Sequence, residues 1–277
     1  MAALRLLAVL AHPDDEALGC GGVLAKYAQG GVETSLVTAT LGDRGRFEGE
    51  PPGSPRHPGR AELAKIRRAE LRASAETLGL RDVTVLDYED QHLDRAPVDA
   101  IVPQLVAHVR RLRPHVVITF PPDGAYGHPD HVAISQFATA AVVAAADPAF
   151  GNGGAASHRV SKLYYFAWSE AQWRAYQAAF KKLVSVVDGV ERQAVPWPDW
   201  SITTVVDTRA WWETVWRAVS CHRSQVAGYE ALRRLAPEHH EALWGTQLFY
   251  RVFSLVNGGR GREHDLFEGL DQGPRPD

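Results

Sequence analysis

The segment VLAHPDDEALGCGG (residues 9–22) begins as an apolar strand and then breaks into a histidine, a proline and three consecutive acids at positions 12–16. Proline and acids are favoured in the first turn of a helix, where an acid faces the positive end of the helix dipole. That preference alone would explain the turn without any chemistry. Whether the turn has a chemical role as well depends on a second segment of the chain with the same arrangement.

A second segment repeats this arrangement. The apolar run HVVITF (115–120) is followed by GHPDH (127–131), which again leads a histidine, a proline and an aspartate into a helical pattern. If both apolar runs are strands of one parallel sheet, their carboxyl ends lie at the same edge, where such sheets bind ligands. The two turns are therefore expected to meet.

The order of elements along the chain predicts such a sheet. Apolar runs of strand length alternate with longer helical patterns, which is typical of a parallel sheet covered by helices on both faces. The predicted strands are 4–11, 32–40, 83–88 and 115–120, and the predicted helices are 16–30, 60–80 and 97–114. We expect an α/β, Rossmann-like fold whose core covers about residues 4–145.

The composition changes after a predicted surface loop at 144–159, because all eight tryptophans lie beyond residue 167. Further predicted elements are two strands, 160–168 and 247–256, and one helix, 210–222. We expect a single domain over residues 1–277, in which a smaller tryptophan-rich subregion, about 159–270, packs on the first sheet. The tail at 271–277 is expected to be disordered.

Composition and charge narrow the class of protein. The hydrophobic fraction of 45% is ordinary for a globular protein, and a net charge of −3 argues against a binder of nucleic acid or anionic membranes. Two cysteines form no disulfide framework, so we expect a cytoplasmic protein. The short N-terminal apolar run is interpreted as a strand and not as a signal peptide, and no run approaches the ~20 residues of a membrane span. The sequence leaves a homo-oligomer open.

The two His/Asp-rich turns predict a catalytic metal site. Imidazole and carboxylate groups bind zinc, and catalytic zinc usually has three protein ligands and a water. We expect His12, Asp15 and His131 to be these ligands, although iron or cobalt would accept the same donors. Asp14 would then lie beside the metal and take the proton from a water whose pKa the metal has lowered to about 7.

Two further residues of the second turn are assigned supporting roles. His128 and His131 project to the same side of a first helical turn, so His128 is expected to stabilise the oxyanion or to protonate the leaving amine. Asp130 is expected to orient one of the imidazoles. Cys20 is interpreted as a packed residue and not as a nucleophile. The remaining histidines are interpreted as polar surface residues: His57, His92, His108, His115, His158, His222, His239, His240 and His264.

The two turns, together with the Arg-x-x-Glu of IRRAEL (66–71) and the Leu-Gly that follows, resemble a family of zinc-dependent de-N-acetylases. That family includes the N-acetylglucosaminyl-phosphatidylinositol deacetylase and the LmbE-like proteins. The likeness is strong over about residues 5–145. The ending HDLFEGL (264–270) is similar to that of the larger members, which act on mycothiol precursors and conjugates.

The resemblance implies the same metal ligands, with Asp14 as general base and His128 as the group that assists the oxyanion or the leaving group. It also implies that Asp130 partners His128 and that Tyr126 helps to polarise the substrate carbonyl. Arg67 falls on a position expected to contact the substrate or its nearby loop. By this resemblance the chain is expected to act on a glucosamine-containing small molecule.

Two loops supply candidates for substrate binding. Arg44 and Arg46 follow the second strand at the ligand edge, where they are either solvated or hold an anionic aglycone. In VPWPDWS (195–201), two prolines hold Trp197 in a non-helical loop. We expect this loop to border the pocket, with Trp197 or Trp200 in contact with the glycoside.

The most direct expectation for function is hydrolysis of an N-acetyl group from an N-acetylglucosaminide, such as the precursor of a low-molecular-weight thiol. Two alternatives stay open: an amidase with the same site that cleaves a thiol conjugate, and a non-catalytic sugar- or nucleotide-binding protein. The glycine-rich GCGG (19–22) does not match the dinucleotide fingerprint Gly-x-Gly-x-x-Gly. We interpret it as permitting close helix–sheet packing.

Overall fold

The computed structural model describes residues 3–151, 155–180, 184–187, 189–226, 230–259 and 261–270. Within these residues, seven strands form one sheet in the order β3-β2-β1-β4-β5-β9-β8. The strands are β1 (Arg5–Leu10), β2 (Glu33–Thr40), β3 (Asp82–Tyr88), β4 (Val116–Thr119), β5 (Lys162–Ala167), β8 (Thr204–Asp207) and β9 (Thr246–Ser254). A separate antiparallel hairpin joins β6 (Val184–Val187) to β7 (Val190–Gln193).

The first five strands run parallel, as the alternation of strands and helices predicts. β1 lies between β2 and β4, and its residues Leu6–Leu10 are buried. A strand covered on both faces needs a continuous apolar run, and β1 has one. The strand order reverses between β1 and β4. At such a switch point, the carboxyl ends of the strands border a crevice that can bind a ligand.

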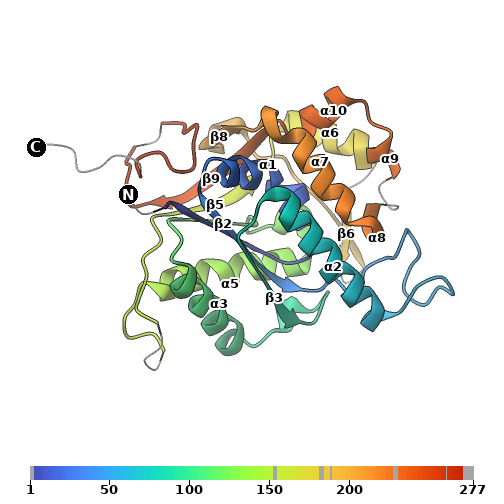
Figure 1. Ribbon diagram of the computed structural model, residues 1–277, viewed down its shortest axis with the longest axis horizontal. Helices are drawn as coiled ribbons and strands as arrows, with labels where there is room; N and C mark the ends of the chain where they lie inside the picture. The colour runs from blue at the N-terminus through green and yellow to red at the C-terminus, as the bar shows by residue number, and fades with distance from the viewer. Residues whose placement is uncertain are drawn as a thin grey trace, which may run out of the picture.

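Helices cover both faces of the sheet (Figure 1). On one face α1 (Asp15–Gln29), α2 (Arg60–Leu78) and α7 (Trp212–Cys221) pack together, and on the other α3 (Val98–Leu112) packs against α5 (Pro129–Ala145). The other helices are α4 (Gly124–Gly127), α6 (Glu170–Phe180), α8 (Arg223–Val226), α9 (Glu230–Arg233) and α10 (Pro237–Trp244), with 3-10 turns at Leu93–Arg95, Asp199–Ser201 and Arg209–Trp211. The predicted α/β class is confirmed.

The glycine-rich part of α1 allows two close approaches. A Cβ atom at Gly19 would lie 3.1 Å from the ring of Phe166 in β5, which agrees with the predicted packing of helix on sheet. A Cβ atom at Gly22 would lie 2.8 Å from the Cβ of Thr208, a distance too short for two carbon atoms. The absence of a side chain at Gly22 therefore also allows the C-terminal part of the chain to pack against α1. Cys20 is completely buried in the same helix, as a packed residue should be.

The C-terminal half, predicted to pack on the first sheet as a smaller subregion, contributes two strands to that sheet. β9 pairs with β5 in the antiparallel direction and β8 pairs with β9, so these strands extend the sheet itself. β8 has only four residues, too few for a periodic pattern to be recognised. The tail at 271–277, for which disorder is expected, lies outside the described residues. No helix in the described part of the chain combines the length and the apolar character that a bilayer span requires.

The segment after β9 is fastened to β5 by a buried ionic cluster. The carboxylate of Glu263 lies 2.7 Å from the ammonium group of Lys162 and accepts a hydrogen bond from the hydroxyl of Tyr164 at 2.7 Å. Arg251 of β9 makes a second ion pair with Glu263 at 2.8 Å. Leu266 is completely buried just beyond this cluster. The end of the described chain is thus part of the packed structure.

Candidate metal and catalytic site

The two His/Asp-rich turns meet at the switch point of the sheet. His12 closely follows the carboxyl end of β1, and Asp14 and Asp15 open helix α1. β4 is followed by α4, after which Pro129 begins α5 in the first-turn position that suits its fixed φ angle. That turn brings His131 next to His12, although 119 positions separate them in the chain.

Three donor groups converge at this point. The Nδ1 atom of His12 lies 3.1 Å from Nε2 of His131. The carboxylate of Asp15 lies 3.6 Å from the former nitrogen and 3.5 Å from the latter. Tetrahedral coordination with bonds of about 2.0–2.2 Å places two ligand atoms about 3.4 Å apart. The two imidazole nitrogens therefore have about the separation of two metal ligands, and the carboxylate approaches each of them with a different oxygen, Oδ2 toward His12 and Oδ1 toward His131.

The second ring nitrogen of each histidine has an oxygen partner that orients the imidazole toward the cluster. Nδ1 of His131 lies 3.2 Å from the carbonyl oxygen of Gly124, to which it can donate, and the ring stacks on Phe120 with centroids 3.8 Å apart. Nε2 of His12 lies 3.0 Å from the carboxylate of Asp130. Each ring thus has an acceptor for one N–H and keeps the lone pair of the other nitrogen for a metal, the usual arrangement around metal-bound histidine.

Two overlapping groups of donors satisfy the spacing that a metal ion needs: His12 with His128 and His131, and His12 with Asp90 and Asp130. The second group surrounds the Nε2 atom of His12, with Asp90 at 3.3 Å. The carboxylates of Asp90 and Asp130 also accept hydrogen bonds from backbone N–H groups. We therefore assign them the role of orienting His12. The predicted ligand set of His12, Asp15 and His131 stays a prediction: the two histidines belong to the first group, and Asp15 belongs to neither.

The structure corrects the pairing implied for Asp130. Its carboxylate contacts His12 and accepts hydrogen bonds from the backbone N–H groups of Gln91 at 2.7 Å and Leu93 at 3.0 Å. With His128 it shares a different bond: the backbone N–H of Asp130 donates to Nδ1 of His128 at 3.2 Å. The cause is local, because the side chain of an N-cap residue turns back to the N–H groups of its own helix. The side chain of Asp130 therefore contacts His12, and its backbone N–H is what contacts His128.

Burial and neighbouring charge set the protonation of the cluster. Burial lowers the pKa of His131 to about 3 and that of His128 to about 4, so both rings are neutral near pH 7. Burial opposes ionisation of Asp15, but the nearby histidines lower its pKa well below the usual range. Burial also works against protonation of His12, yet its three carboxylate neighbours raise its pKa overall. A divalent cation bound here would favour the neutral form of both ring ligands and the ionised form of Asp15.

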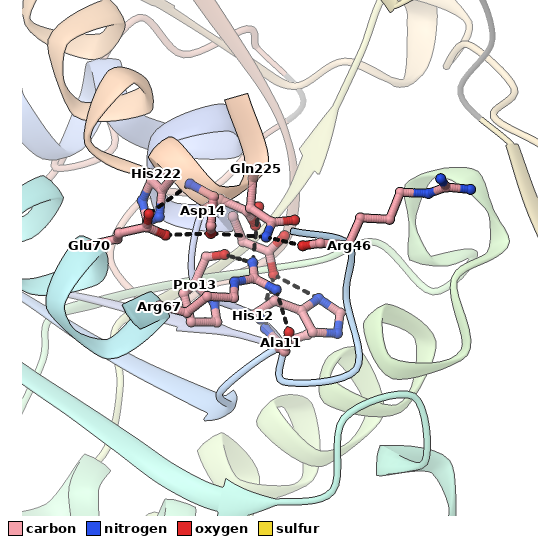
Figure 2. Close-up of polar contacts among 12 residues, drawn as sticks. Ala11, His12, Pro13, Asp14, Arg46, Arg67, Glu70, His222 and Gln225 are labelled. Atoms are coloured by element: carbon pink, nitrogen blue, oxygen red, sulfur yellow. Dashed lines mark hydrogen bonds and ion pairs between the residues drawn. The ribbon is translucent and has the colours of Figure 1, made fainter. Parts of the chain in front are cut away.

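Asp14 occupies a strained position beside this cluster. Its φ angle is 104°, in the left-handed region that costs a residue with a side chain about 1–3 kcal/mol. The guanidinium of Arg67 binds its carboxylate at 3.1 Å and also the carbonyl oxygen of Pro13 (Figure 2). Burial raises the pKa of Asp14 to about 6, although Arg67 works to lower it. A carboxylate with such a pKa is suited to accept and return a proton near neutral pH.

Arg67 is buried between the two loops that flank Asp14. Its guanidinium donates to the carbonyl oxygen of Gly42 at 2.8 Å. Gly42 has a φ angle of 60°, and a Cβ atom there would collide with the guanidinium. A glycine is thus required at this position for Arg67 to reach the site. The structure places Arg67 in the wall of the cavity, in contact with the loop that follows β2.

A cavity of about 220 Å³ opens over these groups. Seven candidate residues from the sequence line it: His12, Asp14, Asp15, Arg67, Tyr126, His128 and His131. Its other wall is largely apolar and contains Leu18, Trp168 and Tyr176. A second hollow of about 770 Å³ adjoins it and shares Gln91 and His128 with it. The candidate reacting groups therefore lie in the smaller space, and the larger one lies beyond His128.

The substrate-binding candidates of the two loops lie outside this cavity. The guanidinium of Arg44 pairs with Glu89, and that of Arg46 donates to the carbonyl oxygen of Gly49 at 3.0 Å, so both are engaged away from the site. Trp197 packs near Tyr250 with ring centroids 5.3 Å apart, and Trp200 is 86% exposed. The tryptophan that lines the cavity is instead Trp168, directly after β5.

Sequence reasoning missed several residues that the structure brings to the site. Asp90 follows β3 as His12 follows β1, so the same rule would have found it. The interpretation of His222 and His240 as surface residues is wrong, because they are 1% and 5% exposed. Nε2 of His222 lies 2.7 Å from the carboxylate of Glu16, to which it can donate a hydrogen bond. Nothing in the local sequence at the end of α7 signals that contact.

Comparison with known proteins identifies similar chains. Residues 7–142 match the PIG-L family, described as GlcNAc-PI de-N-acetylase. A 1D-myo-inositol 2-acetamido-2-deoxy-alpha-D-glucopyranoside deacetylase of Rhodococcus jostii (strain RHA1) is 33% identical over 301 residues, which cover 98% of this chain and 99% of that protein. The likeness therefore extends beyond the N-terminal motifs into the C-terminal half.

Two solved structures share the fold. The conserved protein TT1542 from Thermus thermophilus is 25% identical, with a TM-score of 0.65 over 92% of this chain and 97% of that one. The 4-carboxy-2-hydroxymuconate hydratase GalB from Pseudomonas putida KT2440 is 20% identical, with a TM-score of 0.68 over 92% and 99%. Because one of these is a hydratase, the fold by itself does not determine the reaction, and the site must be argued from its own residues.

Proposed function

This chain belongs to the PIG-L family of de-N-acetylases, and we propose that it removes the acetyl group from N-acetylglucosamine joined to inositol. It is a metal-dependent hydrolase of that family. One observation carries the proposal for the substrate: similarity at 33% identity runs over nearly the whole of this chain and of a deacetylase named for this glucosaminide. The convergence of His12, Asp15 and His131 near the end of β1 supports the reaction.

The donor set fits zinc, with His12, Asp15 and His131 as the residues that would hold it. A zinc ion bound there would acidify a water molecule and polarise the acetamide carbonyl. The protein residues do the remaining work. Asp14, beside the three ligands, accepts the proton of the attacking water, because its carboxylate lines the cavity and its pKa of about 6 leaves it ionised at neutral pH.

His128 is placed to stabilise the oxyanion. Its Nδ1 accepts a hydrogen bond from the backbone, so in the neutral ring the proton is on Nε2. Since burial lowers the pKa of His128 to about 4, it donates a hydrogen bond at neutral pH and does not deliver a proton. This favours the oxyanion role over protonation of the leaving amine. Asp14, once protonated, is then the group that returns the proton to the amine.

The two hollows suggest how the glycoside lies. The acetamido sugar occupies the cavity over the reacting groups, where Trp168 offers an aromatic face to the sugar ring and Tyr126 contacts the acetamide carbonyl. The inositol extends past His128 into the second hollow. Polar side chains line that hollow and can bind hydroxyl groups: His92, Asp94, Arg95, Gln136 and Arg192.

A panel of substrates tests this function. Zinc-loaded protein should release acetate from the N-acetylglucosaminide of inositol faster than from that of malate or from free N-acetylglucosamine. Replacing Arg192 with alanine should raise KM for the inositol compound and leave KM for the free sugar unchanged. Faster cleavage of a thiol conjugate than of any acetamide would instead identify an amidase with the same site. Tight sugar binding with no turnover would identify a non-catalytic protein.

A further inference from the structure

We propose that His222 and Glu16 act as positioning residues for Asp14: through Glu16, His222 holds the backbone of Asp14 in the strained conformation that aims its carboxylate at the reacting groups. The proposal rests on the function given above, because it assigns Asp14 a role in the deacetylation. It concerns two residues that are not among those lining the cavity or predicted to bind the metal.

The strained backbone of Asp14 needs a local restraint. A φ angle of 104° persists in an aspartate only when surrounding contacts outweigh its cost. Arg67 restrains the carboxylate of Asp14 and the carbonyl oxygen of Pro13. The backbone N–H of Asp14 is held separately, because it donates to Oε2 of Glu16 at 2.9 Å. Glu16 thus holds a part of the turn that Arg67 does not contact.

Glu16 is itself held by partners from distant parts of the chain. It is completely buried, and a buried carboxylate without hydrogen bonds would be strongly destabilised. Its Oε1 accepts bonds from the hydroxyl of Ser74 in α2 and from Nε2 of His222, the latter at 2.7 Å. Its position therefore depends on the packing of α2 and of the end of α7 against α1.

His222 holds Glu16 through a single nitrogen of its ring. Among the described residues, its Nδ1 has no hydrogen-bond partner, although the residue is 1% exposed. The imidazole therefore depends on the Nε2 contact with Glu16, which lies 206 positions away in the chain. An unsatisfied buried nitrogen is destabilising, and an apolar residue in a purely packing role would avoid that cost.

The residues after His222 connect the same segment to the loop beside the cavity. Ser224 binds the carboxylate of Glu70 through its backbone N–H and its hydroxyl, each at 2.7 Å. Gln225 donates to the backbone carbonyl oxygen of Arg46 at 2.8 Å (Figure 2). These bonds fix the segment after α7 against α2 and the loop, which gives His222 a rigid base from which to hold Glu16.

Two substitutions at position 222 separate positioning from simple packing. In glutamine the amide nitrogen falls near the place of Nε2 of histidine, whereas in asparagine it falls near Nδ1. His222→Gln should therefore keep the bond to Glu16 and retain most of the activity. His222→Asn should lose that bond and lower kcat by about 10–100-fold, with KM and zinc content little changed. His240→Asn is the matched control, since His240 is also buried but its Nε2 contacts the carbonyl oxygen of Leu232.

The Asp14→Asn background provides the decisive comparison. If His222 acts through Asp14, adding His222→Asn to Asp14→Asn should lower the residual rate by no more than about twofold, because residues that act as a unit are not additive. An equal fold-loss of kcat in both backgrounds would overturn the proposal. So would parental kcat in His222→Asn.

A crystal structure of His222→Asn tests the same inference without activity. The φ angle of Asp14 should leave the left-handed region, or its N–H should lose Glu16, while the structure of His240→Asn should keep both. An unchanged Asp14 in His222→Asn would overturn the positioning role even if the parent cleaved no acetamido sugar. Failure of the parent on every acetamide, with Asp14 displaced as expected, would instead contradict the proposed function alone.

Discussion

The Nδ1 atom of His12 and the Nε2 atom of His131 face each other at 3.1 Å, in turns that follow two adjacent parallel strands. Each ring has an oxygen acceptor for its other nitrogen, so two lone pairs would meet here without a cation or a shared proton. Burial opposes protonation of His12, but its carboxylate neighbours raise its pKa overall. A proton shared between the two rings is therefore favourable. A bound metal ion would displace it, so metal binding should weaken as the pH falls.

The first prediction concerns the ligands. His12→Ala, Asp15→Ala and His131→Ala should each lose most of the metal that the parent retains after dialysis, since each removes one of three donors. His128→Ala should retain it, because His128 is assigned to the oxyanion. Metal content measured by atomic emission on the dialysed proteins decides this. Equal metal loss in His128→Ala and His131→Ala would mean that the two histidines have been exchanged.

The second prediction concerns the general base. Asp14→Asn should bind metal but lose about 10²–10⁴-fold in kcat, because an amide cannot accept the proton of water. The rate of the parent should fall as the pH drops through about 6, where Asp14 becomes protonated. Near-parental turnover in metal-loaded Asp14→Asn would exclude the role.

The third prediction concerns Arg67. Its positive charge lowers the pKa of Asp14 against the larger opposing effect of burial, so Arg67→Met should raise that pKa. The acid limb of the pH–rate profile should then shift to higher pH. A shift to lower pH would show that Arg67 does not act on Asp14 by its charge. Arg60→Met is the control, because Arg60 is an exposed residue of the same helix that pairs with Asp43.

The fourth prediction concerns the pocket wall. Trp168→Ala should raise KM for the glycoside, because Trp168 lines the cavity, whereas Trp197→Ala should not. Both variants should retain metal. Equal effects of the two substitutions on KM would mean that Trp168 has no special contact with the sugar.

The fifth prediction concerns stability. Glu263→Ala should lower the free energy of unfolding by about 3–5 kcal/mol, because it leaves the charge of Lys162 buried without its partner. Glu170→Ala removes an exposed pair with Arg174 and should change it by less than about 1 kcal/mol. Denaturant titration of the two variants measures both values. Similar losses of unfolding free energy in the two variants would show that the buried ionic cluster stabilises the protein no more than an exposed pair does.

The stability that this ionic cluster contributes should depend on pH through the carboxylate of Glu263. Burial opposes its ionisation, but its hydrogen bonds to Asn257 and Lys162 lower the pKa of Glu263 from 4.5 to about 2. The stabilisation is therefore fully present above pH 4.5 and is lost as the pH falls toward 2. The parent should lose stability over this range more steeply than Glu263→Ala does.

The parallel half of the sheet and the meeting of its two turns could be predicted from the sequence. Continuous apolar strands end in His/Asp-rich turns, and parallel strands leave their carboxyl ends at one edge, so the sequence alone places His12 near His131. Asp90 obeys the same rule after β3, but a single aspartate is a weak signal.

The C-terminal contributions could not be predicted in this way. His222 reaches Glu16 only because α7 packs against α1 and α2, and packing between helices far apart in sequence leaves no local pattern. The prolines beside Trp197 indicate a fixed loop but not its direction, and the ring packs near Tyr250. Strand β8 is too short to have a recognisable period, so the sequence does not reveal the extension of the sheet.

The most direct test of the account is acetate release from the N-acetylglucosaminide of inositol, measured on one preparation before and after removal of its metal with a chelator. We expect turnover by the zinc-loaded protein, loss of that turnover on chelation, and its return when one equivalent of zinc is added. Absence of acetate release by the zinc-loaded protein, or undiminished release after the metal has been removed, would contradict the account.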